Sequence, residues 1–124
     1  MEMKLELIAL PVSDVDNALD FYTHKAGFHL DHDHQVNDSL RFIQLTPPGS
    51  ACSITIGNGI ATDMKPGSVK GLQMVVVDAK AAYDELKSRG VDVTEPEVMP
   101  WGTFVYFSDP DGNKWSLQQM PPHQ

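Results

Sequence analysis

The sequence predicts an α+β fold made from two copies of one strand–helix–strand–strand–strand module. Three observations predict it. A helix with a capping aspartate follows an apolar strand at Asp14 and again at Asp78. A turn rich in Pro and Gly precedes the last strand of each half, at residues 46–50 and 109–113. A stretch without hydrophobic period separates the halves, and the order of elements then begins again.

The two modules form one domain, residues 1–124. We expect the first module at about residues 4–57, a linker at about 58–69 and the second module at about 70–120. A chain of this length buries roughly two thirds of the surface that it exposes when unfolded. Two such modules can bury their helices on one side and pair their sheets, which leaves a concave face.

Composition and charge exclude several classes of partner. The formal net charge is −8, and no cluster of Lys and Arg follows one face, so nucleic acid and anionic membranes are disfavoured as partners. No apolar run approaches the roughly 20 residues that span a bilayer, and the first residues do not resemble a signal peptide, so a cytoplasmic location is expected. The single cysteine, Cys52, excludes an internal disulfide and is predicted to be a buried, inert thiol.

In the first half, an apolar run at residues 5–12 predicts a strand, and the spacing of apolar residues over 15–26 predicts a helix that Gly27 ends. Residues 28–35 are extended but polar, which indicates an edge strand. Two further strands are predicted at 40–45 and 51–56.

In the second half, residues 72–77 predict a strand and 79–88 a helix that Gly90 ends. A strand is expected to begin at residues 91–93, and residues 95–102 are predicted to be an irregular rim segment. A hairpin follows, with strands at 104–107 and 115–118 on either side of the turn Asp-Pro-Asp-Gly-Asn.

Three segments carry a resemblance to a known family. These are Pro-Val-Ser-Asp-Val-Asp-Asn-Ala-Leu-Asp-Phe-Tyr at 11–22 with Gly27-Phe28, then Val77-Asp78 with Gly90-Val91, and Phe-Ser-Asp-Pro-Asp-Gly-Asn at 107–113. The chain thereby resembles the vicinal oxygen chelate superfamily, the group of glyoxalases, bleomycin-resistance proteins and extradiol dioxygenases. The resemblance implies two βαβββ modules that form a cup-shaped mixed sheet, commonly as a homodimer.

In metal-dependent members of that superfamily, a His on the first strand and a Glu on the last strand of each module hold a divalent ion in the cup. Counting from the motifs, the corresponding positions hold Leu7, Ser53, Gly71 and Ser116. None of these is a good ligand for a hard cation, so we expect no metal and no cofactor. A shift by two residues would bring in Thr55, Gln73 and Gln118, which are also weak ligands.

Histidines and carboxylates crowd one predicted strand, residues 29–34. By strand alternation His32 and His34 share one face, and His29, Asp31 and Asp33 share the other. A two-His metal site with an added carboxylate is conceivable, but we favour a solvated rim strand whose charges prevent edge pairing. The other motif carboxylates are explained as helix caps and turn residues, and no residue is predicted to be catalytic.

The predicted cup lining indicates a binding site. If Ser116 faces inward, alternation places Trp115, Leu117, Val105 and Phe107 against the helices instead. The residues expected to line the cup are Leu7, Ala9, Ser53, Thr55, Gln73, Trp101, Phe104, Tyr106, Ser116 and Gln118. Such an apolar, aromatic lining with a few neutral polar groups suits a hydrophobic or planar small molecule, although the aromatics could also simply fill the space.

The sequence therefore supports three hypotheses. The first is a metal-independent small-molecule binding protein that resembles the bleomycin-resistance branch and confers antibiotic resistance by sequestering its ligand. The second is a divalent-metal-dependent glyoxalase, lyase or dioxygenase-like enzyme with a displaced metal site that uses His32, His34 or Gln73. The third is a homodimer whose sheets serve assembly alone.

Overall fold

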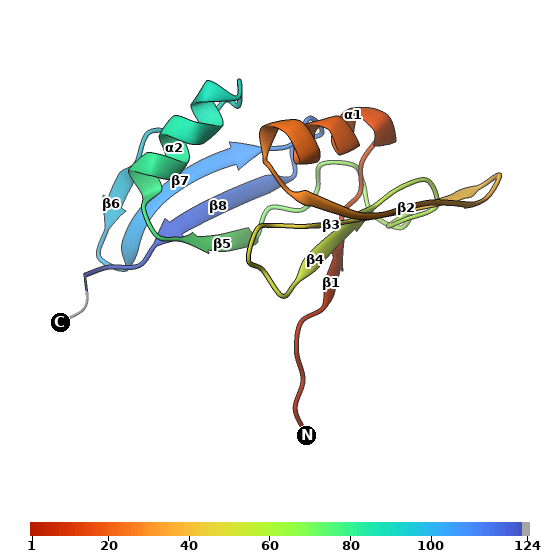
Figure 1. The fold of residues 1–124 in the computed structure, drawn as a ribbon, viewed down its shortest axis with the longest axis horizontal. Helices are drawn as coiled ribbons and strands as arrows, with labels where there is room; N and C mark the ends of the chain where they lie inside the picture. The colour runs from red at the N-terminus through yellow and green to blue at the C-terminus, as the bar shows by residue number, and fades with distance from the viewer. Residues whose placement is uncertain (123–124) are drawn as a thin grey trace.

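The computed structural model describes residues 1–122 and contains two four-stranded sheets with the strand orders β1-β4-β3-β2 and β5-β8-β7-β6. The first module comprises β1 (Leu7–Ala9), α1 (Val15–Asp20), the π-helix η1 (Phe21–Lys25), β2 (His29–Asn37), β3 (Leu40–Thr46) and β4 (Ser53–Ile56). The second comprises β5 (Leu72–Val76), α2 (Ala79–Ser88), β6 (Glu97–Met99), β7 (Gly102–Ser108) and β8 (Lys114–Gln119). The helices lie on the same side of the two sheets (Figure 1).

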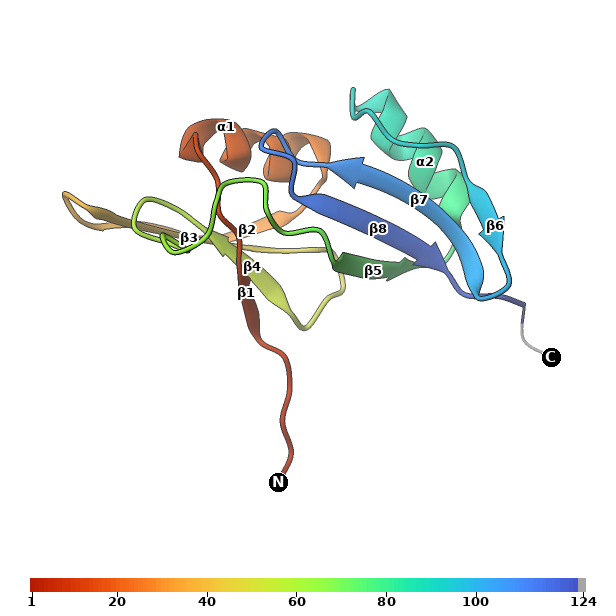
Figure 2. The same cartoon turned by 180° about the vertical axis from the view of Figure 1, so that it is seen from behind.

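Each sheet is mixed in the same way. The first strand of each module runs parallel to the last, β1 to β4 and β5 to β8, and the remaining neighbours are antiparallel. This confirms the predicted α+β fold of two βαβββ modules. Within one chain the two sheets stay separate, and β1 and β5 are edge strands. The segment before β1 leads away from the body of the molecule, as Figure 2 shows from behind.

Aspartate side chains begin both helices, as the sequence predicts. Asp14 accepts a hydrogen bond from the backbone N–H of Asn17, and Asp78 accepts one from that of Ala81, each at 3.1 Å. The first helix continues to Lys25 in a wider π form, because the N–H of Ala26 bonds to the carbonyl of Phe21, five residues back. Gly27 then turns the chain with φ of 80°.

The segment between α2 and β7 differs from the prediction. Residues 91–93 form no strand; Val91 and Val93 instead enter the core. The strand of this region is β6, within the stretch expected to be irregular. The backbone N–H of Thr94 donates to the carbonyl of Tyr106 at 2.9 Å, but the hydroxyl of Thr94, and not its carbonyl, accepts the N–H of Tyr106 at 2.9 Å. Pro96 has no N–H to donate. The regular register between β6 and β7 therefore begins only at Glu97.

One hydrophobic core joins the two modules. Phe21 of the first module packs against Phe107 of the second, and Tyr22 and Phe28 pack against Trp115, with ring centroids 5.5–6.1 Å apart in these three pairs. Alternation along β7 and β8 buries Val105 and Leu117 in the same core, as predicted from the sequence.

The turn Asp-Pro-Asp-Gly-Asn fastens the second module to the first. The buried carboxylate of Asp109 accepts hydrogen bonds from the hydroxyl of Tyr22 and from the amide of Asn113, both at 2.8 Å. Asn113 also donates to the carbonyl of Pro11 at 2.9 Å and accepts from the N–H of Val69 at 3.1 Å. The most recognisable motif of the sequence therefore has a structural role, because it ties together both modules and the linker.

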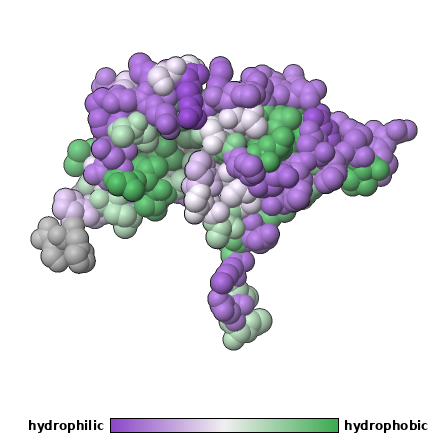
Figure 3. Space-filling view, in the orientation of Figure 1, coloured by the Kyte–Doolittle hydropathy of each residue, from purple (hydrophilic) through white to green (hydrophobic). Residues whose placement is uncertain are grey.

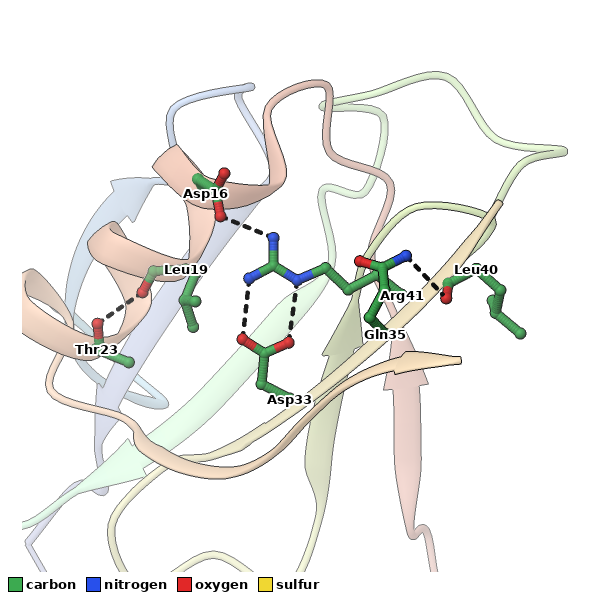
Figure 4. A network of polar contacts seen from close by, with 7 residues as sticks. All are labelled: Asp16, Leu19, Thr23, Asp33, Gln35, Leu40 and Arg41. Carbon is green, nitrogen blue, oxygen red and sulfur yellow. Dashed lines mark hydrogen bonds and ion pairs between the residues drawn. The ribbon is translucent and has the colours of Figure 1, made fainter. Parts of the chain in front are cut away.

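An ion-paired arginine fastens α1 to the β2–β3 hairpin (Figure 4). Arg41 donates to both carboxylate oxygens of Asp33, at 3.0 and 2.9 Å, and to Asp16 at 2.7 Å. The hydrogen bonds from the guanidinium lower the pKa of Asp33. Asp33 therefore lies on the helix side of its sheet.

Candidate functional site

The open face of the second sheet carries a network of neutral polar side chains from β5 and β8. Gln73 pairs with Ser116 in the register of these parallel strands. The Ser116 hydroxyl donates to Gln73 Oε1 at 3.0 Å, Gln73 Nε2 donates to Gln118 Oε1 at 2.9 Å, and Gln118 Nε2 donates to the carbonyl of Trp101 at 2.8 Å. Each side chain fixes the next, so the amide groups present a defined orientation.

Two aromatic rings lie beside this network on β7. Phe104 and Tyr106 are nearly parallel, with an interplanar angle of 8° and centroids 6.1 Å apart. They stand opposite Gln118 and Ser116 respectively. Lys114 Nζ lies 5.0 Å from the Tyr106 ring centroid. This face therefore carries an aromatic part beside a hydrogen-bonding part.

Phe104 and Trp101 differ in exposure. Phe104 is 5% exposed although it faces away from the helices, and Trp101, on the rim, is 58% exposed.

Hydrophobic surface gathers over the second module and again where the N-terminal segment leaves β1 (Figure 3).

The other predicted site residues lie together on the first sheet. Leu7 is the register partner of Ser53, and Ala9 that of Thr55. Ser53 and Thr55 are 5% and 4% exposed, whereas Leu7, at 37%, and Ala9 are exposed. The hydroxyl of Thr55 is buried and has no hydrogen-bond partner in the described part of the chain.

Three polar residues of this face were missed from the sequence. Gln44 and Thr46 of β3 alternate with the buried Ile43 and Leu45, so the alternation itself could have found them. Asp31 could not have been found in this way. A register shift between Leu30 and His32 breaks the alternation.

The register shift also corrects the predicted faces of β2. Asp31 and Asp33 do not share a face. Asp31 accepts a hydrogen bond from Thr46 on the open side of the sheet, whereas Asp33 binds Arg41 on the helix side. The bulge turns Asp31 to the side where the predicted ligand-lining residues of the first sheet lie.

The two groups of site residues belong to separate sheets, and among residues 1–122 no side-chain hydrogen bond joins one group to the other. They approach each other at one place. A hollow of about 270 Å³ between the starts of β4 and β5 is lined by Ser53 and Gln73, together with Leu5, Cys52 and Met74. Burial raises the pKa of the Cys52 thiol, so it stays protonated beside this hollow.

The residues do not fit the divalent metal that the family resemblance implies. The register pairs Leu7 with Ser53 and Gln73 with Ser116, so the structural counterpart of Leu7 is Gln73. Counting from the motif had suggested Gly71 instead. One alkyl group, one amide and two hydroxyls form a neutral donor set that a hard cation binds poorly. Over residues 1–122, no three His, Cys, Asp or Glu side chains gather closely enough to hold a metal ion.

The histidine pair on β2 lies on the open side of the first sheet. His32 and His34 stack with ring centroids 5.8 Å apart, opposite Gln44 and Phe42. Both are exposed. Two imidazoles without a third ligand are an incomplete site for a transition metal.

Comparison with known proteins defines the family. The model of the Glyoxalase/Bleomycin resistance protein/Dioxygenase superfamily matches residues 4–117, and the chain belongs to this superfamily. Over 123 residues the chain is 30% identical to YetH of Bacillus subtilis (strain 168), covering 96% of this chain and 100% of that protein. Among the helices of residues 1–122, none is long and apolar enough to cross a membrane.

Two solved structures are similar over almost the whole chain. TnmS3, an antibiotic-binding protein from Streptomyces sp. CB03234, is 38% identical with a TM-score of 0.87, covering 97% of this chain and 98% of that chain. A superfamily member from Sphaerobacter thermophilus DSM 20745 is 36% identical with a TM-score of 0.81, covering 94% of this chain and 97% of that chain.

Proposed function

We propose that the protein binds a hydrophobic or planar small molecule without a metal and protects against it by sequestration, as in bleomycin resistance. The observation that carries this proposal is the partly exposed ring of Tyr106, packed against the buried Phe104, beside the ordered network of Gln73, Ser116 and Gln118. Stacking on the Tyr106 ring would hold a flat molecule, and the amides would orient its polar edge. The similarity to TnmS3, an antibiotic-binding protein, supports an antibiotic as the ligand.

We propose further that a second copy of the chain completes the cup. The free edge of β1 in one copy would lie beside the free edge of β5 in the other, which would place Leu7, Ala9, Ser53 and Thr55 opposite the aromatic face of the partner. Unpaired edges accept such pairing readily. Apolar residues stand exposed at both edges, including Leu5 at 68% and Val75 at 65%.

Thermal denaturation against a panel of planar aromatic antibiotics tests binding. A ligand at 100 times its dissociation constant should add about 2.7 kcal/mol to the free energy of unfolding. Tyr106→Ala should abolish the stabilisation. Tyr83→Ala is the matched control, because Tyr83 also lies beneath lysine Nζ atoms but belongs to α2, on the helix side of the sheets. If no compound stabilises the protein, or if both variants respond like the wild type, the proposal is wrong.

A metal-dependent enzyme is the second candidate, and the adjacent His32 and His34 favour it. Metal analysis of protein purified without chelator decides between the two. We expect far less than one equivalent of Zn, Ni, Mn or Fe per chain. One tight equivalent that is lost in His32→Ala, together with turnover, would replace the binding hypothesis by the enzyme.

A further inference from the structure

The hydroxyl groups on the open face of the first sheet form a chain with a fixed direction. An ionised carboxylate only accepts hydrogen bonds, so the Thr46 hydroxyl is the donor and Asp31 is the acceptor. The Thr46 oxygen lies 2.6 Å from that of Ser53, and because the Thr46 proton is already used, Ser53 must donate to Thr46. Ser53 Oγ in turn accepts from Gln44 Nε2 at 3.4 Å.

This direction decides what the face offers to a ligand. Both hydroxyl groups, of Thr46 and Ser53, already donate their hydrogen bond in the direction of Asp31. The oxygens of Thr46, Ser53 and Gln44 can therefore only accept a hydrogen bond from a ligand. The negative charge of Asp31 lies at the end of the chain, and its side chain is 22% exposed. The arginine of this hairpin, Arg41, binds on the opposite side of the sheet. The exposed His29 lies on the same face, with Nε2 3.7 Å from Asp31 Oδ1. The face is therefore rich in hydrogen-bond acceptors.

Thr55 supplies an independent observation. It lies on the same strand face as Ser53, directly opposite Gln44 in the register, and is 4% exposed with no partner for its hydroxyl. A buried hydroxyl without a partner destabilises the folded state, because it has lost its hydrogen bonds to water. The bond from Gln44 Nε2 to Ser53 Oγ is long and therefore weak, so a ligand group would displace it at little cost.

We propose that Asp31, Gln44, Thr46, Ser53 and Thr55 form a subsite for a protonated amino group of the small molecule. The aliphatic or aromatic body of the ligand would lie on the apolar part of the cup, and its ammonium would donate to the acceptor face. This inference rests on the proposed function, because it names the polar group that the same cup selects. It also explains why buried polar side chains stand in a sheet face that a purely apolar ligand would not need.

Three naphthalenes that differ only in one substituent test the subsite: 1-naphthylmethylamine, 1-naphthalenemethanol and 1-naphthoate, titrated at neutral pH. A charge-assisted hydrogen bond should make the amine bind at least about tenfold tighter than the alcohol, and the anion should bind weakest. Equal affinities would overturn the subsite and leave the binding function intact. Binding of none of the three would overturn both.

Variants then assign the preference to the named residues. Asp31→Asn and Thr46→Val should each reduce the preference for the amine over the alcohol to about twofold or less. Asp38→Asn is the matched control, because it removes the same charge from the exposed tip of the same hairpin and should leave the preference unchanged. A preference that survives Asp31→Asn would overturn the proposal.

Thr55→Val separates a ligand contact from a structural role. The valine removes an unpartnered hydroxyl at nearly constant volume, so the melting temperature should stay the same or rise. Affinity for the amine should nevertheless fall by about threefold or more. A lower melting temperature with unchanged affinity would show that Thr55 serves the fold alone, and would remove it from the subsite.

Discussion

At the scale of single residues, the hydroxyl of Tyr22 connects the modules. It donates to Asp109 Oδ2 at 2.8 Å and accepts from Trp115 Nε1 at 3.0 Å, and all three residues are buried. Burial, together with the negative charge of Asp109, raises the pKa of Tyr22, so the hydroxyl keeps its proton. The bond matters because the Asp109 carboxylate is buried and, among residues 1–122, forms no ion pair that could replace a lost donor.

We expect Tyr22→Phe to lower the free energy of unfolding by about 1–3 kcal/mol, because it leaves the Trp115 N–H without a partner and deprives Asp109 of one donor. Urea denaturation measures this. Tyr83→Phe, on the partly exposed face of α2, should cost less than about 0.5 kcal/mol. Equal effects of the two changes would contradict the connecting role of Tyr22.

At the scale of elements, the linker is held against the turn of the second module by a close backbone approach. Gly67 has φ of 80°, and a Cβ at this position would lie 1.9 Å from the carbonyl oxygen of Asp111. Gly49 in the turn before β4 has nearly the same φ, 78°, but has open space around it. Alanine substitutions at Gly49 and Gly67 therefore separate two costs. Both include the conformational cost of a positive φ, but only the change at Gly67 adds a steric clash.

We expect Gly49→Ala to destabilise the protein by about 1 kcal/mol, the cost of a positive φ. Gly67→Ala should cost at least about 2 kcal/mol more, because Asp111 and its hydrogen bonds to Ser13 must also move. Chemical denaturation of both variants gives the difference. If they unfold at the same denaturant concentration, the linker does not depend on this contact.

At the scale of the whole molecule, the open edges of the two sheets determine the assembly that we propose. Apolar and charged residues alternate in the segment before β1, and Met1, Met3 and Leu5 are largely exposed in the single chain. This is the pattern of a strand with one buried face. The partner that would bury it is the β5 edge of a second copy.

We therefore expect Leu5→Glu to shift the protein from dimer toward monomer by at least about tenfold in the dissociation constant, since a charge would be buried at the edge. Sedimentation equilibrium measures the change. Val98→Glu places the same charge on β6, the far edge of the second sheet, where Val98 is 82% exposed, and should leave the dimer intact. A wild-type monomer at all concentrations would refute the completed cup.

The sequence predicted most of the fold for local reasons. Capping aspartates, turn glycines and strand alternation act within a few residues, so the bounds of α2, the edge position of β2 and the burial of Val105 and Leu117 were all predicted. The prediction failed at residues 91–99, where a threonine hydroxyl competes with the backbone ladder and Pro96 interrupts it. Such competition depends on what lies across the sheet.

Site residues could be predicted from the sequence where the regular alternation of side chains along a strand decides which face they occupy. The sequence by itself determined the family fold and the absence of imidazoles and carboxylates at the positions where the family resemblance places metal ligands. Only the tertiary structure decided that a bulge turns Asp31 toward Thr46, that Gln73 stands opposite Ser116, and that Thr55 keeps an unpartnered hydroxyl. The reason is that register and hydrogen-bond direction arise between strands, whereas a sequence pattern describes one strand at a time.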